Sequence, residues 1–252
     1  MLIAVDIGNT NIHLGLFDLD SRQLVSRFTV SASNTHLKNL PVDSFILQSA
    51  SDCILASVNP RAESAFCNWL DSRWDRSPLR IPIDVPIHIP VLVKDPERVG
   101  VDRLLNALAA FQRTGTTTIV VDVGTAITID VISNKGEFLG GVIAPGLESL
   151  KEALHTRTAF LPKVSVQRPQ HVLGKDTEKA VRTGLYWGGV GVIEKITKKL
   201  IEELGNKPSV LATGGDAELL ANEIQLIDRV VPHLTLEGIL TAYNAQFSGK
   251  GI

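Results

Sequence analysis

The chain has 252 residues, of which 44% are hydrophobic and 21% are charged, with a formal net charge of -2. A chain of this length and composition can bury a sizeable core and is long enough for two compact domains. Its balanced charge, with an isoelectric point near 6.3, argues against a nucleic-acid partner, because such proteins neutralise phosphates with a basic surface.

The first part of the chain alternates short runs rich in β-branched residues with turn-forming residues. These runs predict strands, which are expected at residues 2–6, 12–17, 23–30 and 53–58. Asn59 followed by Pro60 predicts a helix N-cap and the first helical turn. The prolines between residues 78 and 96 allow only short or edge strands there. Beyond them, "VDRLLNALAAFQ" from Val101 has the apolar spacing of a helix.

A second series of similar elements starts near Thr116. Three strands are expected in it, at residues 116–122, 127–132 and 137–143. Helices are predicted after Gly146 and from about Asp176, and "PSVLATGG" predicts a strand that ends at paired glycines. The last two helical patterns are "AELLANEI" and "LEGILTAYNAQF". The repetition predicts a duplicated α/β domain, with residues 1–114 and 115–252 as its two copies.

A turn of the same composition follows the first strand of each series, as "DIGNT" from Asp6 and as "DVGTA" from Asp122. Glycine lets consecutive backbone N–H groups approach a phosphate, because no Cβ stands in the way. Asn9 and Thr10 add short side chains that can donate to phosphate oxygens. The Asp6 carboxylate would repel phosphate unless a cation lay between them, so we expect Mg²⁺ there. A simple hairpin turn is the commoner explanation of one isolated copy, whereas two copies favour a nucleotide bound by both.

Four segments together carry a resemblance to a known family. They are "DIGNT" at 6–10, "DPERVGVDR" at 95–103, "DVGTAIT" at 122–128 and "GGVIAPG" at 140–146. In this order and spacing they resemble the type III pantothenate kinases of the acetate and sugar kinase, Hsp70 and actin superfamily. The resemblance implies an α/β fold of two ribonuclease H-like domains with a nucleotide cleft between them. It also implies ATP-dependent phosphorylation of pantothenate to 4'-phosphopantothenate, the first step of coenzyme A biosynthesis, by a homodimer.

The resemblance assigns Asp102, in the Gly-x-Asp-Arg element, as the proton acceptor. It also implies a group of substrate-binding residues, which are Val93, Gly100, Val101, Asp102, Arg103 and Thr177. A carboxylate suits phosphoryl transfer, because it need only orient the attacking hydroxyl and collect its proton late. The Arg103 guanidinium matches a substrate carboxylate. Ordinary structural roles stay open: Asp102 at a helix start, Arg103 in an ion pair, and Thr177 as an N-cap or first-turn residue.

The nucleotide and cation sites are carried over from the family in the same way. ATP-binding residues are expected at Asp6, Ile7, Gly8, Asn9, Thr10, Asn11, Ile12, His13 and Thr125. Asp122 is assigned to a monovalent cation, K⁺ or ammonium, and Asp6 to Mg²⁺ through phosphate. Gly214 and Gly215 resemble the glycine pair on the adenosine side of the superfamily's site, although paired glycines after a strand also form ordinary turns.

Two positions depart from the family pattern. Some members have a lysine where this chain has His13, and a histidine that is mostly neutral at pH 7 carries less charge to a phosphate. Many members have an aromatic residue where this chain has Val93, so looser packing around the acceptor is expected.

Two other functions stay open on this scaffold. One is a regulatory protein of the Bvg accessory factor type, which would bind a nucleotide or partner without useful turnover. The other is a kinase for a different small hydroxylated acceptor, or a phosphohydrolase, because a few apolar contacts worth ~1 to 3 kcal/mol each can separate acceptors. The presence of Asp6, Asp102 and Asp122 favours a working kinase.

The compartment is predicted from what the sequence lacks. Cys53 and Cys67 are the only cysteines, and neither lies in a metal-ligand spacing, so neither a disulfide framework nor a zinc site is expected. The N-terminal segment lacks the pattern of a signal peptide, and no run approaches ~18 apolar residues. We therefore expect a cytoplasmic protein without membrane partners.

Overall fold

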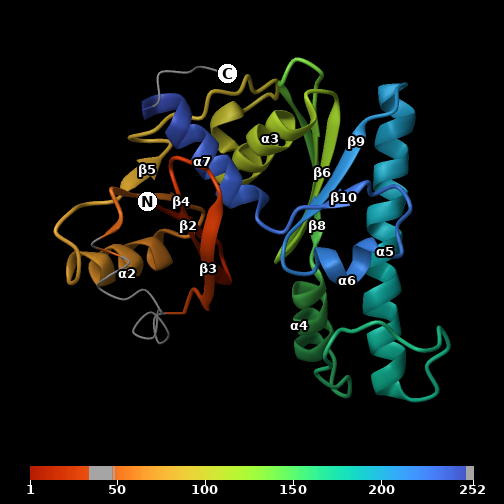
Figure 1. The fold of residues 1–252 in the computed structure, drawn as a ribbon. Helices are drawn as coiled ribbons and strands as arrows, with labels where there is room; N and C mark the ends of the chain where they lie inside the picture. Colours follow the sequence, from red (N-terminus) through yellow and green to blue (C-terminus); the bar gives the residue numbers. More distant parts are fainter. Residues whose placement is uncertain (34–46, 48, 248–252) are drawn as a thin grey trace. The chain divides into compact units, whose positions relative to one another are not determined.

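The computed structural model of the protein describes residues 1–33, 47 and 49–247, and the chain divides into two compact units (Figure 1). The first unit comprises the described residues within Met1–Pro90, Lys94–Ala109 and Leu234–Ile252, and the second comprises Val91–Val93 and Ala110–His233. The last helix packs on the first sheet and so belongs to the first unit, although it comes at the end of the chain.

The first unit contains a five-stranded sheet in the order β3-β2-β1-β4-β5. Its strands are β1 (Leu2–Ile7), β2 (Asn11–Phe17), β3 (Leu24–Ser31), β4 (Asp52–Ser57) and β5 (Leu79–Ile81). Strand β1 runs antiparallel to β2 and parallel to β4. The three-residue β5, at the edge of the sheet, agrees with the short or edge strand expected in the proline-rich segment.

The second unit repeats this sheet strand for strand, in the order β8-β7-β6-β9-β10. Its strands are β6 (Thr118–Val123), β7 (Ala126–Ile132), β8 (Phe138–Pro145), β9 (Ser209–Thr213) and β10 (Arg229–Val230). Strand β6 is antiparallel to β7 and parallel to β9, as β1 is to β2 and β4. Even the register irregularity recurs, between Leu16 and Phe17 in β2 and between Val131 and Ile132 in β7. The repeated order and directions confirm the expected duplicated α/β fold.

Both faces of the first sheet are covered by apolar side chains. One core contains alternate residues of β1, β2 and β4 packed against α2 (Pro60–Asp71), whose N-cap is Asn59 as expected. The other core joins the opposite face to α3 (Val101–Thr114) and α7 (Leu234–Phe247). The alternation along β1 places Ile3, Val5 and Ile7 in one core and Leu2 and Ala4 in the other.

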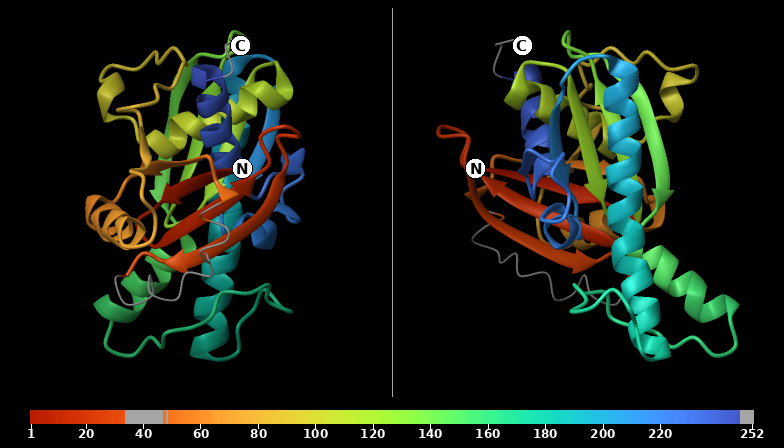
Figure 2. Two further views of the ribbon diagram at one scale, coloured as in Figure 1. Left: turned by 60° about the vertical axis from the view of Figure 1, so that its left-hand side comes forward. Right: turned by 90° about the vertical axis from the view of Figure 1, so that its right-hand side faces the viewer.

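The second sheet packs one face against helices of its own unit. That core contains the alternate residues Ile119, Val121 and Val123 of β6, together with side chains of α5 (Thr177–Leu204) and α6 (Ala217–Ala221). Helix α4 (Leu147–Arg157) begins directly after β8. Figure 2 shows that α4 and the first turns of α5 extend beyond the end of the second sheet.

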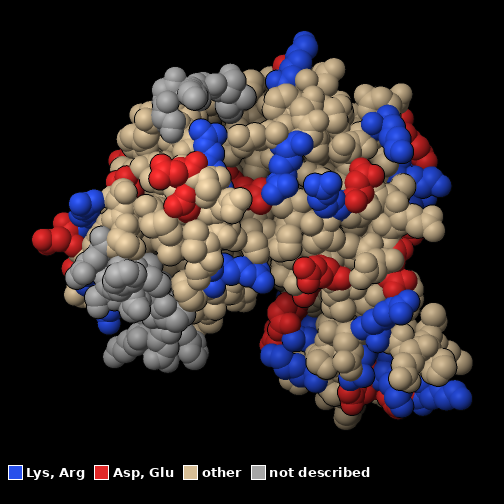
Figure 3. All heavy atoms as spheres, in the orientation of Figure 1, with Lys and Arg blue, Asp and Glu red and all other residues tan. Residues whose placement is uncertain are grey.

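Neither cysteine forms a disulfide; both Cys53 and Cys67 are buried and free. Burial raises the pKa of the Cys53 thiol well above its ordinary value. Acidic and basic side chains are intermixed on the face drawn in Figure 3. Within the described part of the chain, every helix is too short or too polar to cross a membrane.

Candidate active site

The first predicted phosphate turn joins β1 to β2. The backbone N–H of Gly8 donates to the carbonyl of Asn11 at 2.9 Å, which closes the turn. A Cβ at Gly8 would lie 3.1 Å from that carbonyl oxygen, so the chain reverses most tightly where glycine is present. Asn9 and Thr10 are exposed at the tip. The turn therefore leaves two short polar side chains exposed at its tip.

The residues flanking the tip differ in what they can offer. Ile7 and Ile12 are completely buried in the first core, so only their backbone atoms can contact a ligand. The His13 ring lies on β2, where Nδ1 is 3.0 Å from the Thr29 hydroxyl. This contact orients the imidazole, and it is a partner that the sequence pattern did not indicate.

A third segment supports the first turn from a distant part of the chain. The N–H of Val58 donates to the carbonyl of Ile7 at 3.0 Å, and the Asn59 side-chain amide donates to the carbonyl of Asn9 at 3.4 Å. Asn59 also caps α2 by accepting from the N–H of Ala62 at 3.2 Å. One side chain thus links the start of a helix to the phosphate turn, a role beyond the capping that was predicted for it.

The second turn, between β6 and β7, is one residue shorter than the first. Here the N–H of Gly124 donates to the carbonyl of Ala126 at 3.0 Å. The Thr125 side chain is exposed. The backbone carbonyl of Thr125 accepts a hydrogen bond from the Ser149 hydroxyl of α4 at 2.7 Å. In register, Asp122 lies opposite Thr128 on β7. The polar groups at this end of β6 therefore include the Asp122 carboxylate, the hydroxyls of Thr125 and Thr128 and the turn's backbone.

Two glycines from elsewhere in the second unit pack directly against this turn. A Cβ at Gly146 would collide with the carbonyl oxygen of Gly124, and one at Gly214 would lie 2.5 Å from Asp122 Oδ1 and 2.6 Å from the nitrogen of Val123. Gly214 also has a φ of 97°, which side-chain-bearing residues rarely adopt. Both glycines follow Asp122 in the sequence, and close backbone packing against the second turn explains why each lacks a side chain.

The predicted proton acceptor, Asp102, is in the first turn of α3. Its Oδ1 accepts from the N–H of Arg103 at 2.8 Å. The same oxygen would lie only 2.5 Å from a Cβ at Gly100, so the carboxylate lies over this glycine. Arg103 and Gly100, its neighbours in the sequence, therefore fix where this carboxylate lies.

Val93 belongs to the second unit, whereas Asp102 belongs to the first. The segment around Val93 runs beside β8, where the N–H of Leu92 donates to the carbonyl of Phe138 at 2.8 Å. A Cβ at Gly140 would lie 3.5 Å from Val93 Cγ1, in ordinary van der Waals contact. Val93 is thus packed along β8.

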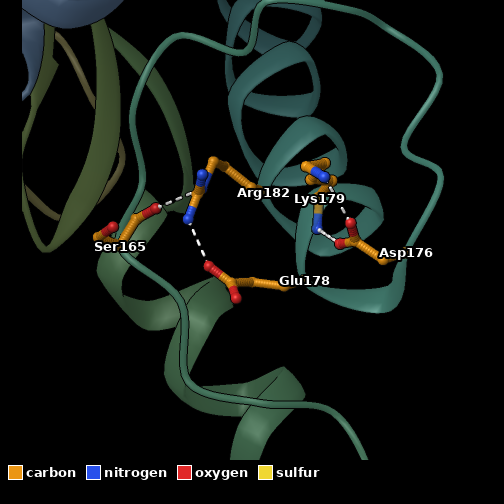
Figure 4. Close-up of polar contacts among 5 residues, drawn as sticks. All are labelled: Ser165, Asp176, Glu178, Lys179 and Arg182. Atoms are coloured by element: carbon orange, nitrogen blue, oxygen red, sulfur yellow. Dashed lines mark hydrogen bonds and ion pairs between the residues drawn. The ribbon is translucent and has the colours of Figure 1, made fainter.

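Thr177 is the first residue of α5, and Asp176 is the N-cap. Figure 4 shows the Asp176 carboxylate accepting from the Lys179 backbone N–H at 2.8 Å and from its ammonium group at 2.7 Å. Both hydrogen bonds lower the pKa of the Asp176 carboxyl, and the one from the Lys179 side chain has the larger effect. The Arg182 guanidinium donates hydrogen bonds to the Glu178 carboxylate and to the backbone carbonyl of Ser165 (Figure 4). This end of α5 is therefore well ordered by local contacts.

Beside Thr177 lies a hollow of about 680 Å³ between α4 and α5. Its walls are mostly apolar and include Leu150, Leu154, Val181 and Leu185. Thr177 lies at a more polar part of the rim, next to Lys175 and Asp176. The structure thus places this residue both at a helix start and on the edge of a pocket.

Comparison with known proteins connects these features. The family model described as type III pantothenate kinase matches residues 2–199. The chain belongs to the type III pantothenate kinase family. A relative named type III pantothenate kinase from Persephonella marina is 35% identical over 251 residues, covering 97% of this chain and 98% of the relative. The expected family, and with it a kinase that phosphorylates pantothenate, is confirmed.

Solved structures of lower identity show the fold alone. A Baf family protein from Campylobacter jejuni has a TM-score of 0.62 at 22% identity, covering 97% of this chain and 98% of its own. A protein from Sinorhizobium meliloti is described as a 2-dehydro-3-deoxygalactonokinase. It has a TM-score of 0.65 at 13% identity, and the match covers 98% of this chain and 99% of that protein. These likenesses, together with the repeated sheet order, confirm the expected fold of two ribonuclease H-like domains.

The expected Mg²⁺ and monovalent cation would need oxygen ligands near the two glycine turns. Among the described residues, no group of three or more His, Cys, Asp or Glu side chains is arranged to hold a metal ion. Mg²⁺ in phosphoryl-transfer sites is commonly bound by one or two carboxylates together with substrate phosphates and water. Asp6 and Asp122, each beside one of the two glycine turns, supply single carboxylates of the kind that such sites use.

Proposed function

We propose that the chain transfers the γ-phosphoryl group of ATP to the hydroxyl of pantothenate with Asp102 as the proton acceptor. The observation that carries this proposal is the family match, because it spans Asp102 and the other residues predicted to bind ATP, pantothenate and the cations. In the reaction, the pantothenate oxygen forms a bond to the γ-phosphorus while the bond from that phosphorus to ADP breaks. The hydroxyl proton passes to the Asp102 carboxylate.

Asp102 is suited to this role by its position. The hydrogen bond from the Arg103 N–H leaves its second oxygen available for a substrate hydroxyl. The Asp102 carboxylate lies in the first turn of α3, at the start of the helix. Arg103 would bind the pantothenate carboxylate through its guanidinium, and Gly100, Val101, Val93 and Thr177 would complete the acceptor contacts.

The nucleotide contacts are assigned to the two glycine turns. In the first, backbone N–H groups and the side chains of Asn9 and Thr10 would donate to phosphate oxygens, with Mg²⁺ between the phosphates and Asp6. In the second, Thr125 would contact the nucleotide, and Asp122 would hold K⁺ or ammonium. These cations would offset the negative charge that accumulates during transfer.

The function is tested by measuring ADP release with ATP, Mg²⁺ and a panel of acceptors, in the presence and absence of K⁺. We expect release that depends on pantothenate and rises with K⁺. A preference for a sugar would indicate a different kinase, and release without any acceptor would indicate a hydrolase. If no acceptor stimulates release although ATP binds, the chain is a regulator and the proposal fails.

The role of Asp102 has its own test. Asp102→Asn should lower kcat by a factor of ~10² to 10⁴, because a positioned general base contributes about that much. ATP affinity, measured by calorimetry, should stay within about twofold of the wild-type value. An Asp102→Asn protein with nearly the wild-type kcat would rule out this base.

We further infer a homodimer that uses the glycine-bearing face of α5. Gly184, Gly188 and Gly191 recur on one face of this helix, and a Cβ added at any of them would meet no atom within 4 Å. Glycine inside a helix is unfavourable by roughly 0.5–1 kcal/mol relative to alanine, so an exposed run of it calls for a packing reason. Close approach of a second α5 would supply that reason.

Sedimentation at micromolar concentration tests this interface. Gly188→Trp should shift the protein from dimer to monomer, because the indole would hold the two helices apart. Glu203→Trp places the same side chain at an exposed position near the end of α5 and should leave the dimer intact. A wild-type monomer, or a Gly188→Trp dimer of unchanged stability, would contradict the inferred interface.

A further inference from the structure

Asp216 lies next to the second phosphate turn without having been assigned any role. It follows the Gly214-Gly215 pair at the carboxyl end of β9, which runs parallel to β6. Its backbone N–H donates to the carbonyl of Val123 at 3.0 Å. Since ligands of α/β sheets bind outside the carboxyl ends of parallel strands, Asp216 occupies a position where a nucleotide is expected.

The Asp216 carboxylate is not used by the structure around it. The residue occupies the N-cap position of α6, but its side chain makes no capping hydrogen bond. Among the described residues it also has no other side-chain hydrogen bond and no ion pair. A partly buried carboxylate without donors is unfavourable, because the lost hydration is not replaced. The side chain therefore has acceptor capacity available for a ligand.

The neighbouring charges indicate what kind of ligand fits. Desolvation raises the pKa of Asp216, the nearby carboxylate of Glu148 raises it further, and Lys151 partly opposes both. Glu148 and Lys151 form an ion pair with each other on α4. Two carboxylates close together disfavour a phosphate group at this point. They favour a neutral group that donates hydrogen bonds, such as the hydroxyls of a sugar.

We propose that Asp216 determines nucleotide specificity by accepting hydrogen bonds from the ribose hydroxyls of ATP. This rests on the proposed function, in which Thr125 of the adjacent turn contacts the same nucleotide. A vicinal pair of hydroxyls can donate to both oxygens of one carboxylate. Acidic residues recognise ribose in this way at the strand ends of other nucleotide-binding sheets. The exocyclic amino group of adenine is the other donor on the nucleoside, and the test separates it from ribose.

The experiment compares equilibrium binding of the Mg²⁺ complexes of ATP, 2'-deoxyATP, 3'-deoxyATP and purine riboside triphosphate by calorimetry. Wild-type protein should bind at least one deoxynucleotide about tenfold more weakly than ATP, and purine riboside triphosphate about as well as ATP. In Asp216→Ala, the difference between ATP and the deoxynucleotide should shrink to about twofold or less. Glu218→Ala removes an equal charge from an exposed position of the same helix and should retain the wild-type difference.

Several results would overturn the proposal. These are equal binding of ATP and both deoxynucleotides by the wild-type protein, or unchanged discrimination in Asp216→Ala. Weaker binding of purine riboside triphosphate alone would assign the carboxylate to adenine instead. If the alanine variant does not fold, Asp216→Asn replaces it, and the comparison of nucleotides on wild-type protein stands by itself. Because binding is measured without pantothenate, these failures are distinct from a lack of acceptor-dependent ADP release, which would refute the proposed function.

Discussion

At the scale of single residues, the position of Asp102 depends on its neighbour. Its Oδ1 is held by the Arg103 N–H, directly over Gly100. A Cβ at position 100 would collide with the Asp102 carboxylate and not with backbone atoms. The carboxylate could relieve this collision by rotating away. This glycine therefore affects where the proposed base lies far more than it affects stability.

Gly100→Ala should lower kcat by about tenfold to a hundredfold, because displacing a reacting group by about 1 Å can cost that much. The thermal midpoint should change little, since only a side-chain rotamer has to adjust. Pantothenate-dependent ADP release and thermal unfolding measure the two effects. A variant that keeps the wild-type kcat would show that the observed carboxylate position is not the reactive one.

At the scale of elements, the second turn is held by segments that approach it as bare backbone. Gly146 is the N-cap of α4 and Gly214 directly follows β9, and both leave no room for a Cβ beside the turn. The β8–α4 and β9–α6 connections therefore act as a support for Asp122 and Thr125. Gly215, the next residue, is exposed and would accommodate a Cβ freely.

The adjacent glycines provide a matched pair of substitutions. Gly214→Ala should lower the free energy of unfolding by about 2–3 kcal/mol, because it combines an unfavourable φ with a collision against Asp122 and Val123. Gly215→Ala should change it by about 0.5 kcal/mol or less. Urea denaturation of both variants checks this. Equal stabilities would mean that the turn is not tightly packed.

At the scale of the whole molecule, the last helix completes the first unit. Leu236, Ile239 and Leu240 of α7 are buried in the core formed with β1, β4 and α3. Two polar contacts fix the helix in place. Tyr243 donates to the Asp52 carboxylate at 2.5 Å, and Thr235 donates to Asn106 Oδ1 at 2.8 Å. Residues from both ends of the chain therefore form one core.

Tyr243→Phe should lower the free energy of unfolding by about 1–3 kcal/mol, because the Asp52 carboxylate loses a buried donor. Burial raises the pKa of the Tyr243 phenol, and the hydrogen bond to Asp52 raises it further. A raised phenol pKa means that this contribution is complete below the ordinary tyrosine pKa of ~10 and is lost only at higher pH.

The matched variant Asp52→Asn keeps an acceptor for the phenol and should cost less than Tyr243→Phe. Urea denaturation between pH 7 and pH 9 measures both variants. A Tyr243→Phe protein as stable as the wild type would contradict the proposed contribution of this hydrogen bond.

Much of the candidate site could be predicted because its parts are local in sequence. The turn at Gly8 and the carboxylate above Gly100 involve residues within four positions of each other, so a short motif contains the whole geometry. Other parts could not be predicted. The Asn59 contact with Asn9 and the packing of Gly214 on Asp122 join segments far apart in the chain, and no local pattern specifies such pairs.

The sequence by itself determined the longer strands, the two glycine turns and the helix starts at Asn59 and Asp176, whereas the two-residue β10 was not predicted. Alternating burial, backbone reversal and side-chain capping act over a few residues, so composition and spacing reveal them. Only the tertiary structure decided that α7 belongs with the first sheet and that Asp216 lies free beside the second turn. Those outcomes depend on which distant segments bury apolar area together, and that balance is settled when the whole chain folds.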